Sequence, residues 1–260
     1  MYSTQQEYYE NLSKISLSRK DFSKGLILPK QLSEGLAYIC GALAGDGNIH
    51  IRKHKYDYTL KCVGNPKDEI LFYQTVLIPL FQTVFNFKPR IGYKDKGTTF
   101  CFVVHSRALC IYLTNIIRLP NGKKHPSLRI PKVFLISKKL KIAFLRGLFD
   151  TDGCVSFKKR HKSYPNYPVI SLNSKTKGLI KQTAHILKKL GFGISETYDY
   201  KVEDKRTKKG YTIINRIDIC GEKNLNHWIK TINFSSPKHL EKIKKVARGG
   251  FEPPTYAQVF

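Results

Sequence analysis

Two aspartates stand out because each ends an apolar segment and is followed by a glycine. Asp46 follows residues 38–45, YICGALAG, and Asp152 follows residues 144–151, FLRGLFDT. If each segment is a helix, its carboxylate meets the negative end of the helix dipole, and two such ends brought together are unfavourable without a cation. Mg²⁺ takes oxygen ligands and often binds through one or two carboxylates plus substrate phosphates. The two aspartates therefore predict a metal-dependent site for phosphodiester chemistry.

Both segments also carry small residues at every fourth position, on one face of a helix. They are Ala37, Gly41 and Gly45 in the first segment and Ala143, Gly147 and Thr151 in the second. Glycine inside a helix costs about 1 kcal/mol relative to alanine, so its repeated use indicates a close approach that only a missing Cβ permits. We expect the two helices to pack through these faces and to bring both aspartates to the same end.

A single Asp-Gly pair after a helix has an ordinary structural explanation, which is a side chain that caps a turn before glycine. The duplicated context in a strongly basic chain favours the functional interpretation for Asp46 and Asp152. Asp150 is interpreted as a capping or core-lining acid and not as a ligand. His105, at the end of an expected strand, either packs or contacts a nucleic acid, and we assign it no catalytic role.

The charge of the chain is extreme for its size. Its 260 residues include 46 Lys and Arg against 19 Asp and Glu, which gives a net charge of +27 and a pI near 9.8. A surplus this large indicates a polyanionic partner, most simply nucleic acid.

Several other classes of protein are disfavoured. No apolar run approaches the roughly 20 residues of a membrane span, and the N-terminus does not resemble a signal peptide. We therefore expect an intracellular protein that is not secreted, in the cytoplasm or an organelle matrix. Six cysteines without a C-x-x-C pair indicate neither a disulfide framework nor a zinc cluster. His50 and His54 fall on an expected strand and turn without the adjacent Glu of a metalloprotease helix, so zinc is disfavoured there too.

The middle of the chain reads as one αββαββα unit used twice. Residues 33–118 form the first unit and residues 138–235 the second, joined by a linker at 119–137 rich in turn residues. Asn65 and Asn173 are separated by nearly the same number of residues as the two aspartates, which indicates a duplication. The expected fold class is α+β, with two antiparallel sheets and the motif helices packed at the centre.

Alternation of apolar and polar residues places the strands within each unit. In the first unit we expect a helix through residues 66–85 that is kinked at Pro79, a hairpin of strands at 90–94 and 98–105, and a helix at 108–117. In the second unit we expect helices at 176–190 and 225–232 and strands at 192–200 and 211–220.

The two ends of the chain lack this pattern. Residues 1–32 are expected to form an arm with at most one turn of helix, and residues 236–260 a tail. Gly250–Pro253 back-translates to DNA containing TTCGAA, a palindrome of many transfer-RNA T arms. We therefore expect the reading frame to end against a transfer-RNA-like gene and the tail to be unselected for folding.

The outward faces and the hairpin tips of both sheets are polar and basic. Two-stranded ribbons fit the major groove of DNA, so two such sheets side by side predict a saddle over double-stranded DNA. The residues expected to contact it are Asn48, His50, Arg52, Lys53, Lys55, Lys61, Arg90, Lys94, Lys96, Ser156, Lys158, Lys159, Arg160, Lys162, Lys201, Lys205, Arg206, Lys208 and Arg216.

The two segments resemble the paired signature of LAGLIDADG homing endonucleases, in the single-chain form that carries two motifs. Residues 145–153, LRGLFDTDG, are a close match. Residues 39–47, ICGALAGDG, have Ala44 where the family name has its first Asp, but they keep the final Asp-Gly. That final Asp is the catalytic acid of the family, so the departure leaves the expected metal ligand in place.

The resemblance implies a site-specific enzyme that breaks both strands of a long asymmetric DNA target and leaves short 3′ overhangs. Asp46 and Asp152, with Gly45 and Thr151, would hold two or three Mg²⁺ ions, for which Mn²⁺ or Ca²⁺ can substitute in binding. Lys61 and Arg216 would stabilise charge or order water, although contacts with DNA phosphate or solvent explain them equally well. The implied enzyme is an intron-encoded monomer with pseudo-twofold symmetry that promotes intron homing.

A second hypothesis uses the same scaffold without cleavage. Ala44 and Gly45 in the first motif keep open a maturase that binds intron RNA, or a regulator that has lost its nuclease, since fold alone does not determine function. The intact second motif argues against lost catalysis.

Overall fold

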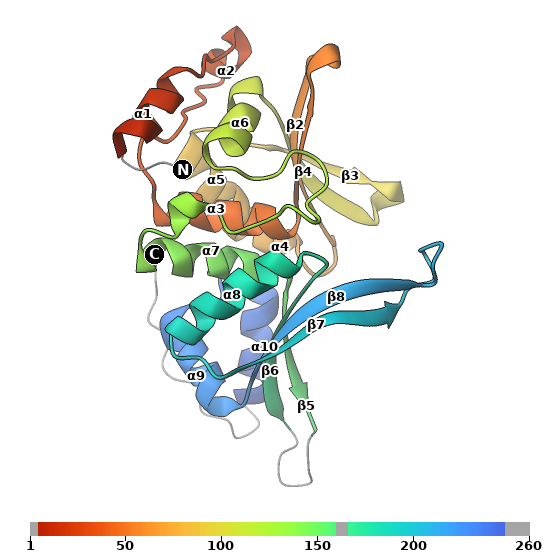
Figure 1. The fold of residues 1–260 in the computed structure, drawn as a ribbon. Coiled ribbons are helices and arrows are strands. Elements are labelled where there is room, and N and C mark those ends of the chain that lie inside the picture. The colour runs from red at the N-terminus through yellow and green to blue at the C-terminus, as the bar shows by residue number, and fades with distance from the viewer. Residues whose placement is uncertain (1–4, 160–165, 248–260) are drawn as a thin grey trace.

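The computed structural model describes residues 5–159 and 166–247 as two similar units stacked about a central pair of helices (Figure 1). The first unit contains α3 (Glu34–Gly45), β1 (Gly47–Arg52), β2 (Asp57–Gly64), α4 (Ile70–Phe72), a π-helical turn (Tyr73–Leu77), α5 (Ile78–Phe85), β3 (Arg90–Lys94), β4 (Thr99–His105) and α6 (Arg107–Ile111) followed by a second π-helical turn (Tyr112–Ile116). The second contains α7 (Lys138–Thr151), β5 (Gly153–Lys158), β6 (Tyr167–Ser174), α8 (Lys177–Lys189), β7 (Ile194–Glu203), β8 (Tyr211–Cys220), α9 (Glu222–Thr231) and α10 (Pro237–Ala247).

Each unit has one four-stranded antiparallel sheet, and the two sheets have the same topology. The strand orders are β1-β2-β4-β3 and β5-β6-β8-β7. The strand that leaves each motif helix starts in an equivalent register, with Gly47 opposite Cys62 and Gly153 opposite Leu172. These features confirm the predicted α+β fold with two antiparallel sheets.

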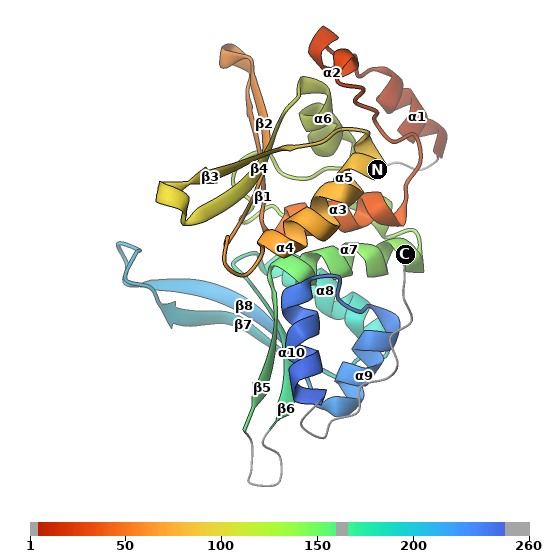
Figure 2. The same ribbon diagram turned by 180° about the vertical axis from the view of Figure 1, so that it is seen from behind.

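One face of each sheet is buried under helices, and the other is open. Leu60 and Phe102 in the first sheet and Leu172 and Ile217 in the second are fully buried on the helix side. The hairpins β3–β4 and β7–β8 project to the same side of the molecule, away from these helices (Figures 1 and 2). We call the open sides of the two sheets the concave face.

Helices α3 and α7 touch through their backbones at the predicted glycines. A Cβ on Gly41 would overlap the carbonyl oxygen of Phe144 and lie 2.9 Å from the backbone nitrogen of Leu148. A Cβ on Gly147 would overlap the carbonyl oxygen of Tyr38 in the reciprocal position. The small-residue faces therefore form the seam between the two units, as predicted.

Both ends of the chain carry more helix than we predicted. The arm contains α1 (Gln5–Ser13) and α2 (Arg19–Ser23), and the Tyr8 side chain is buried with its hydroxyl 2.7 Å from that of Tyr112. Tertiary contact stabilises these helices, whose own sequence is polar and lacks periodicity. Part of the predicted tail is α10, which packs against β5 and α4 and buries Ile243. Residues 248–260, including the segment related to the transfer-RNA palindrome, lie outside the described residues.

The expected kink at Pro79 takes the form of a π-helical turn. Proline lacks an N–H and its ring clashes with the carbonyl four residues earlier, and the wider turn at Tyr73–Leu77 immediately precedes it without ending the helix. In the part of the chain that the structure describes, no helix combines the length and apolar character needed to cross a membrane.

Candidate active site and nucleic-acid interface

Asp46 and Asp152 occupy equivalent positions as the C-caps of α3 and α7. The residue after each aspartate must be glycine because a side chain has no room there. A Cβ on Gly47 would lie 2.6 Å from the Leu43 carbonyl oxygen, and a Cβ on Gly153 would overlap the Phe149 carbonyl oxygen. A Cβ on Gly45 would lie 3.3 Å from the carboxylate carbon of Asp152. The two acids thus converge across the helix seam, as the spacing of the small residues predicted.

The surroundings of both acids disfavour their negative charge. Burial, followed by the charges of Asp152 and Glu69, raises the pKa of Asp46 to about 7. Burial also raises the pKa of Asp152 to about 6, with a smaller effect from Glu69. Asp152 nevertheless keeps an exposed surface and Asp46 a partly exposed one, so a small ligand reaches both. A cation at this position would relieve the accumulated charge.

Three residues that sequence reasoning missed complete the charge balance of the site. The ammonium group of Lys124, from the linker, donates a hydrogen bond to the Gly45 carbonyl and lowers the pKa of both aspartates. Lys238 in α10 lies 3.1 Å from the carboxylate of Glu69, which precedes α4. Lys124 was missed because it lies in a linker without periodicity. Lys238 was missed because residues 236–260 were assigned to the tail.

The raised pKa of Asp46 leads to a testable dependence of stability on pH. Its ionisation disfavours the folded state, so the stability present at pH 4 and below declines as pH rises toward 7. We expect Asp46→Asn, in EDTA at pH 8, to be more stable than the wild type by about 2 kcal/mol, after allowance for solvent that reaches the carboxylate. Urea unfolding at pH 4 and pH 8 measures this difference, which should vanish at pH 4. A variant less stable than the wild type at pH 8 contradicts the assignment.

The donor set fits a divalent ion that is shared with a substrate. Within residues 5–159 and 166–247 no group of three or more His, Cys, Asp or Glu side chains is arranged to enclose a metal. Asp46 and Asp152 instead offer two carboxylates with no third acid as ligand, since Glu69 is engaged by Lys238 and by the Asn65 backbone N–H. Mg²⁺ commonly binds in this way, through one or two carboxylates completed by water and substrate phosphates.

The other residues predicted for the site are nearby but differently engaged. The Gly45 carbonyl accepts the Lys124 ammonium, and the Thr151 hydroxyl donates to the carbonyls of Gly147 and Leu148. Lys61 lies on the concave face, and desolvation, then the adjacent Lys94, lowers its pKa. Arg216 is on the equivalent face of the second sheet, 2.7 Å from Asp218.

Asp150 has a structural environment, in agreement with its interpretation as a capping acid. Its carboxylate accepts hydrogen bonds from the Tyr38 hydroxyl at 2.6 Å and from the backbone N–H groups of Ser235 and Ser236. It is buried, and its partners come from α3 and from the two residues that precede α10. Asp150 therefore joins the seam to the C-terminal helix.

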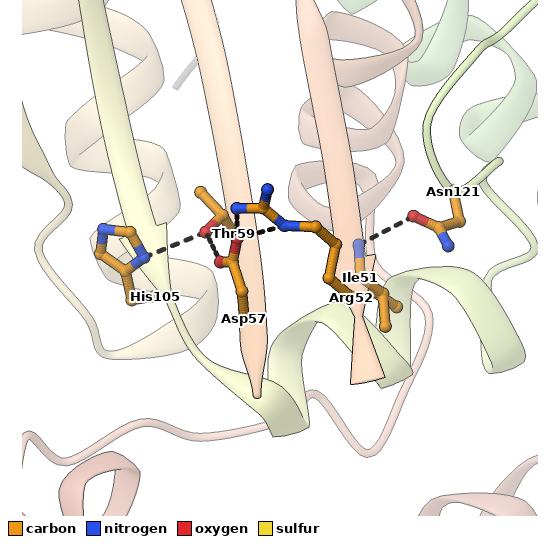
Figure 3. Close-up of polar contacts among 6 residues, drawn as sticks. All are labelled: Ile51, Arg52, Asp57, Thr59, His105 and Asn121. Atoms are coloured by element: carbon orange, nitrogen blue, oxygen red, sulfur yellow. Dashed lines mark hydrogen bonds and ion pairs between the residues drawn. The ribbon is translucent and has the colours of Figure 1, made fainter. Parts of the chain in front are cut away.

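Hydrogen bonds between side chains of neighbouring strands connect the concave face of the first unit (Figure 3). Arg52 bonds Asp57, and Thr59 donates to the same carboxylate at 2.6 Å and lies 3.1 Å from the His105 ring. The hydrogen bonds from Thr59 and Arg52 lower the pKa of Asp57 to about 2. His105 is exposed beside Thr59, whose side chain is buried in this network.

The remaining predicted contact residues are distributed along both sheets and their tips. Exposed members on the concave face include Asn48, His50, Arg90, Lys94 and Lys158. At the tips are Lys53, Lys55, Lys96, Lys159, Lys205, Arg206 and Lys208, of which Arg206 is paired with Asp204. Ser156 is half-buried on β5. Lys201 pairs with Ile213 and lies over the Tyr211 ring, on the face opposite Arg216 and not on the concave face where its contact was predicted. Arg160 and Lys162 lie outside the described residues.

Comparison with known sequences finds relatives over most of the chain. Residues 139–233 match the family model of the LAGLIDADG-like domain. A probable translation initiation factor IF-2 of Methanocaldococcus jannaschii is 28% identical over 92% of this chain and 19% of its own length. An uncharacterized protein of the same organism is 25% identical over 88% of this chain and 77% of its own length. The chain spans about a fifth of the length of the initiation factor.

Solved structures share the arrangement of both units. I-DmoI in complex with DNA and Ca superposes with a TM-score of 0.55 and 19% identity, covering 82% of this chain and 98% of that one. I-DmoI in complex with DNA and Mn gives a TM-score of 0.53 and 23% identity over 77% and 97% of the two chains. The second unit thus matches the LAGLIDADG-like domain model, and the chain as a whole shares the two-unit fold of these structures.

Proposed function

We propose that this protein is a site-specific DNA endonuclease that hydrolyses one phosphodiester bond in each strand of a long asymmetric target. The observation that carries this proposal is the convergence of Asp46 and Asp152 at one end of the helix seam, between two open sheets of a chain with net charge +27. Metal complexes of I-DmoI with DNA, on the same fold, support divalent-ion use. Short 3′ overhangs, intron homing and an intron-encoded monomer are part of the same proposal.

In this mechanism the chain supplies binding, charge balance and orientation. Asp46 and Asp152 would hold divalent Mg²⁺, which when bound would supply Lewis-acid chemistry for phosphodiester hydrolysis. The Lys124 ammonium lies beside both acids and favours their ionised, metal-binding form. Lys61 and Lys94 form a pair of cations on the first sheet that suits a phosphate oxygen. Arg216, oriented by Asp218, is the corresponding cation of the second sheet.

Selection of cleaved sites from a random duplex library tests the proposal. We expect the purified full chain with Mg²⁺ to enrich one long sequence without internal symmetry, because the two sheets differ in their side chains. EDTA should abolish cleavage, and dilution of the protein should leave the rate per complex unchanged, since both acids lie in one chain. Failure to cut any duplex with Mg²⁺ or Mn²⁺ would exclude an endonuclease.

Lys124 provides a prediction about charge in the site. Lys124→Met removes the ammonium that lowers the pKa of both aspartates, so we expect cleavage of both strands to slow by about 10²-fold. Because both acids must be ionised to hold the metal, the rising limb of the pH–rate profile should move to higher pH. Lys123→Met, which changes the exposed neighbouring residue, is the matched control. An unshifted profile with an unchanged rate would remove Lys124 from the mechanism.

A further inference from the structure

The long hairpin of the second sheet contains a β-bulge that changes which side chains face the concave side. Thr197 pairs with Arg216 and Tyr200 pairs with Ile214, so Tyr198 and Asp199 together lie opposite Asn215. A bulge of this type inserts one extra residue in one strand and leaves the partner strand regular.

The side chains on each face of the hairpin follow from this register, because directly paired residues point to the same face. On the regular strand β8, Thr212 and Ile214 share the concave face with Arg216. Their partners on β7 beyond the bulge, Val202 and Tyr200, therefore lie on that face as well. If the same sequence ran through this strand with strict alternation and no bulge, Tyr200 and Val202 would lie on the opposite face.

Specific contacts hold the bulge in place. Asp199 has a positive φ of 54°, a conformation few non-glycine residues adopt. Its backbone N–H donates to the Asn215 side-chain oxygen at 3.1 Å, and the Asn215 amide donates to the carbonyls of Ser174 and Lys175. Asn215 is 1% exposed and the Asp199 carboxylate is paired with Lys177. These contacts stabilise the bulge, and the bulge determines which face of the hairpin the residues beyond it occupy.

The concave surface of this outer hairpin is neutral and largely apolar. Tyr200 is 56% exposed, and Val202, Thr212 and Ile214 are half-buried along it. The corresponding hairpin of the first sheet presents Arg90 and Lys94, both exposed, on its concave face. The two hairpins project to the same side of the molecule (Figure 1). The hairpin of the first sheet would present positive charge to a bound duplex, and that of the second sheet an apolar surface.

We infer that the patch of Tyr200, Val202, Thr212 and Ile214 recognises thymine methyl groups in the half-site bound by the second unit. In the major groove, thymine alone presents a methyl group, and apolar side chains or a Thr methyl contact it, whereas Arg and Lys bond the acceptors of guanine. The patch continues the polar concave face that carries Arg216, so the same groove reaches it. This inference rests on the proposed function and specifies how one half of the target is read.

Replacement of single thymines by deoxyuridine in the selected target tests the inference, because it removes only the methyl group. Binding is measured with the full chain and Ca²⁺ for each substituted duplex. We expect two or more positions of one outer half-site to lose about three- to fivefold in affinity each, as loss of one buried methyl predicts. Ile214→Ser should abolish the sensitivity at one of these positions. Ile213→Ser, on the opposite face of the same strand and 44% exposed, should leave it intact.

Tyr200→Ser supplies a second arm of the test. It should abolish the deoxyuridine effect at one of the sensitive positions, while the effect assigned to Ile214 remains. A target that is cut but insensitive to deoxyuridine, that lacks thymine in this half-site, or that responds equally to Ile213→Ser and Ile214→Ser overturns the inference and leaves the endonuclease proposal standing. A chain that neither binds nor cuts any selected duplex overturns both.

Discussion

Asp152→Asn and Asp46→Asn should each lower the rate of double-strand cleavage by about 10³-fold or more. An amide cannot replace a carboxylate as a charged ligand, and the loss of several kcal/mol of charge stabilisation at the reacting phosphate corresponds to this factor. Quantification of nicked and linear plasmid carrying the selected target measures the loss strand by strand. If Asp152→Asn still cuts both strands at the wild-type rate, the proposed mechanism is wrong.

Asp150→Asn is the informative control for this experiment. Asp150 belongs to the same helix end and also has a raised pKa, of about 7, caused chiefly by burial. Its carboxylate bonds Tyr38, Ser235 and Ser236 and not the acid pair. An amide has one acceptor oxygen where the Asp150 carboxylate has two, so Asp150→Asn leaves at least one of these donors unpaired. We expect this loss to outweigh the relief of the buried charge and to lower the free energy of unfolding, while the folded fraction retains cleavage. Binding of the target in Ca²⁺ should show that Asp46→Asn and Asp152→Asn act on chemistry and not on folding.

Gly41→Ala and Gly147→Ala should each destabilise the fold by about 3 to 5 kcal/mol, among the largest effects of a single methyl group. Each added Cβ would overlap a carbonyl oxygen of the facing helix, and backbone cannot move aside as a flexible side chain can. The intrinsic preference of helices for alanine opposes this cost by only about 1 kcal/mol. Urea unfolding of both variants measures the effect.

Gly92→Ala provides the matched comparison, because a Cβ at Gly92 would have no neighbour within 4 Å. Its free energy of unfolding should stay within about 0.5 kcal/mol of the wild type. Equal destabilisation by Gly92→Ala and Gly41→Ala would show that the seam tolerates a wider separation than the contacts imply.

The parts of this protein that could be predicted from its sequence are those that depend on the spacing of residues close together in the chain. The glycines of the two motif helices, the Asp-Gly ends and the alternating strands each follow from residues close in the chain. Lys124 was missed because it lies in a linker without periodicity. Glu69 was missed although it lies in a predicted helix, because its proximity to Asp46 arises only from tertiary packing. The bulge at Asp199 was missed for the same reason, since a buried Asn215 on the neighbouring strand maintains it.

The packing of α10 also determines when, during synthesis, the groups around Asp46 and Asp150 gain all their partners. Lys238, from this last helix, pairs with Glu69 beside Asp46, and Ser235 and Ser236 complete the hydrogen bonds of Asp150. A nascent chain that has released both motif helices from the ribosome still lacks these partners. Domains fold as they emerge during translation, so the first unit can form early, but its charge balance is complete only after the second unit has been made. If the proposed function is correct, truncated chains that end before Ser235 should therefore cleave DNA poorly.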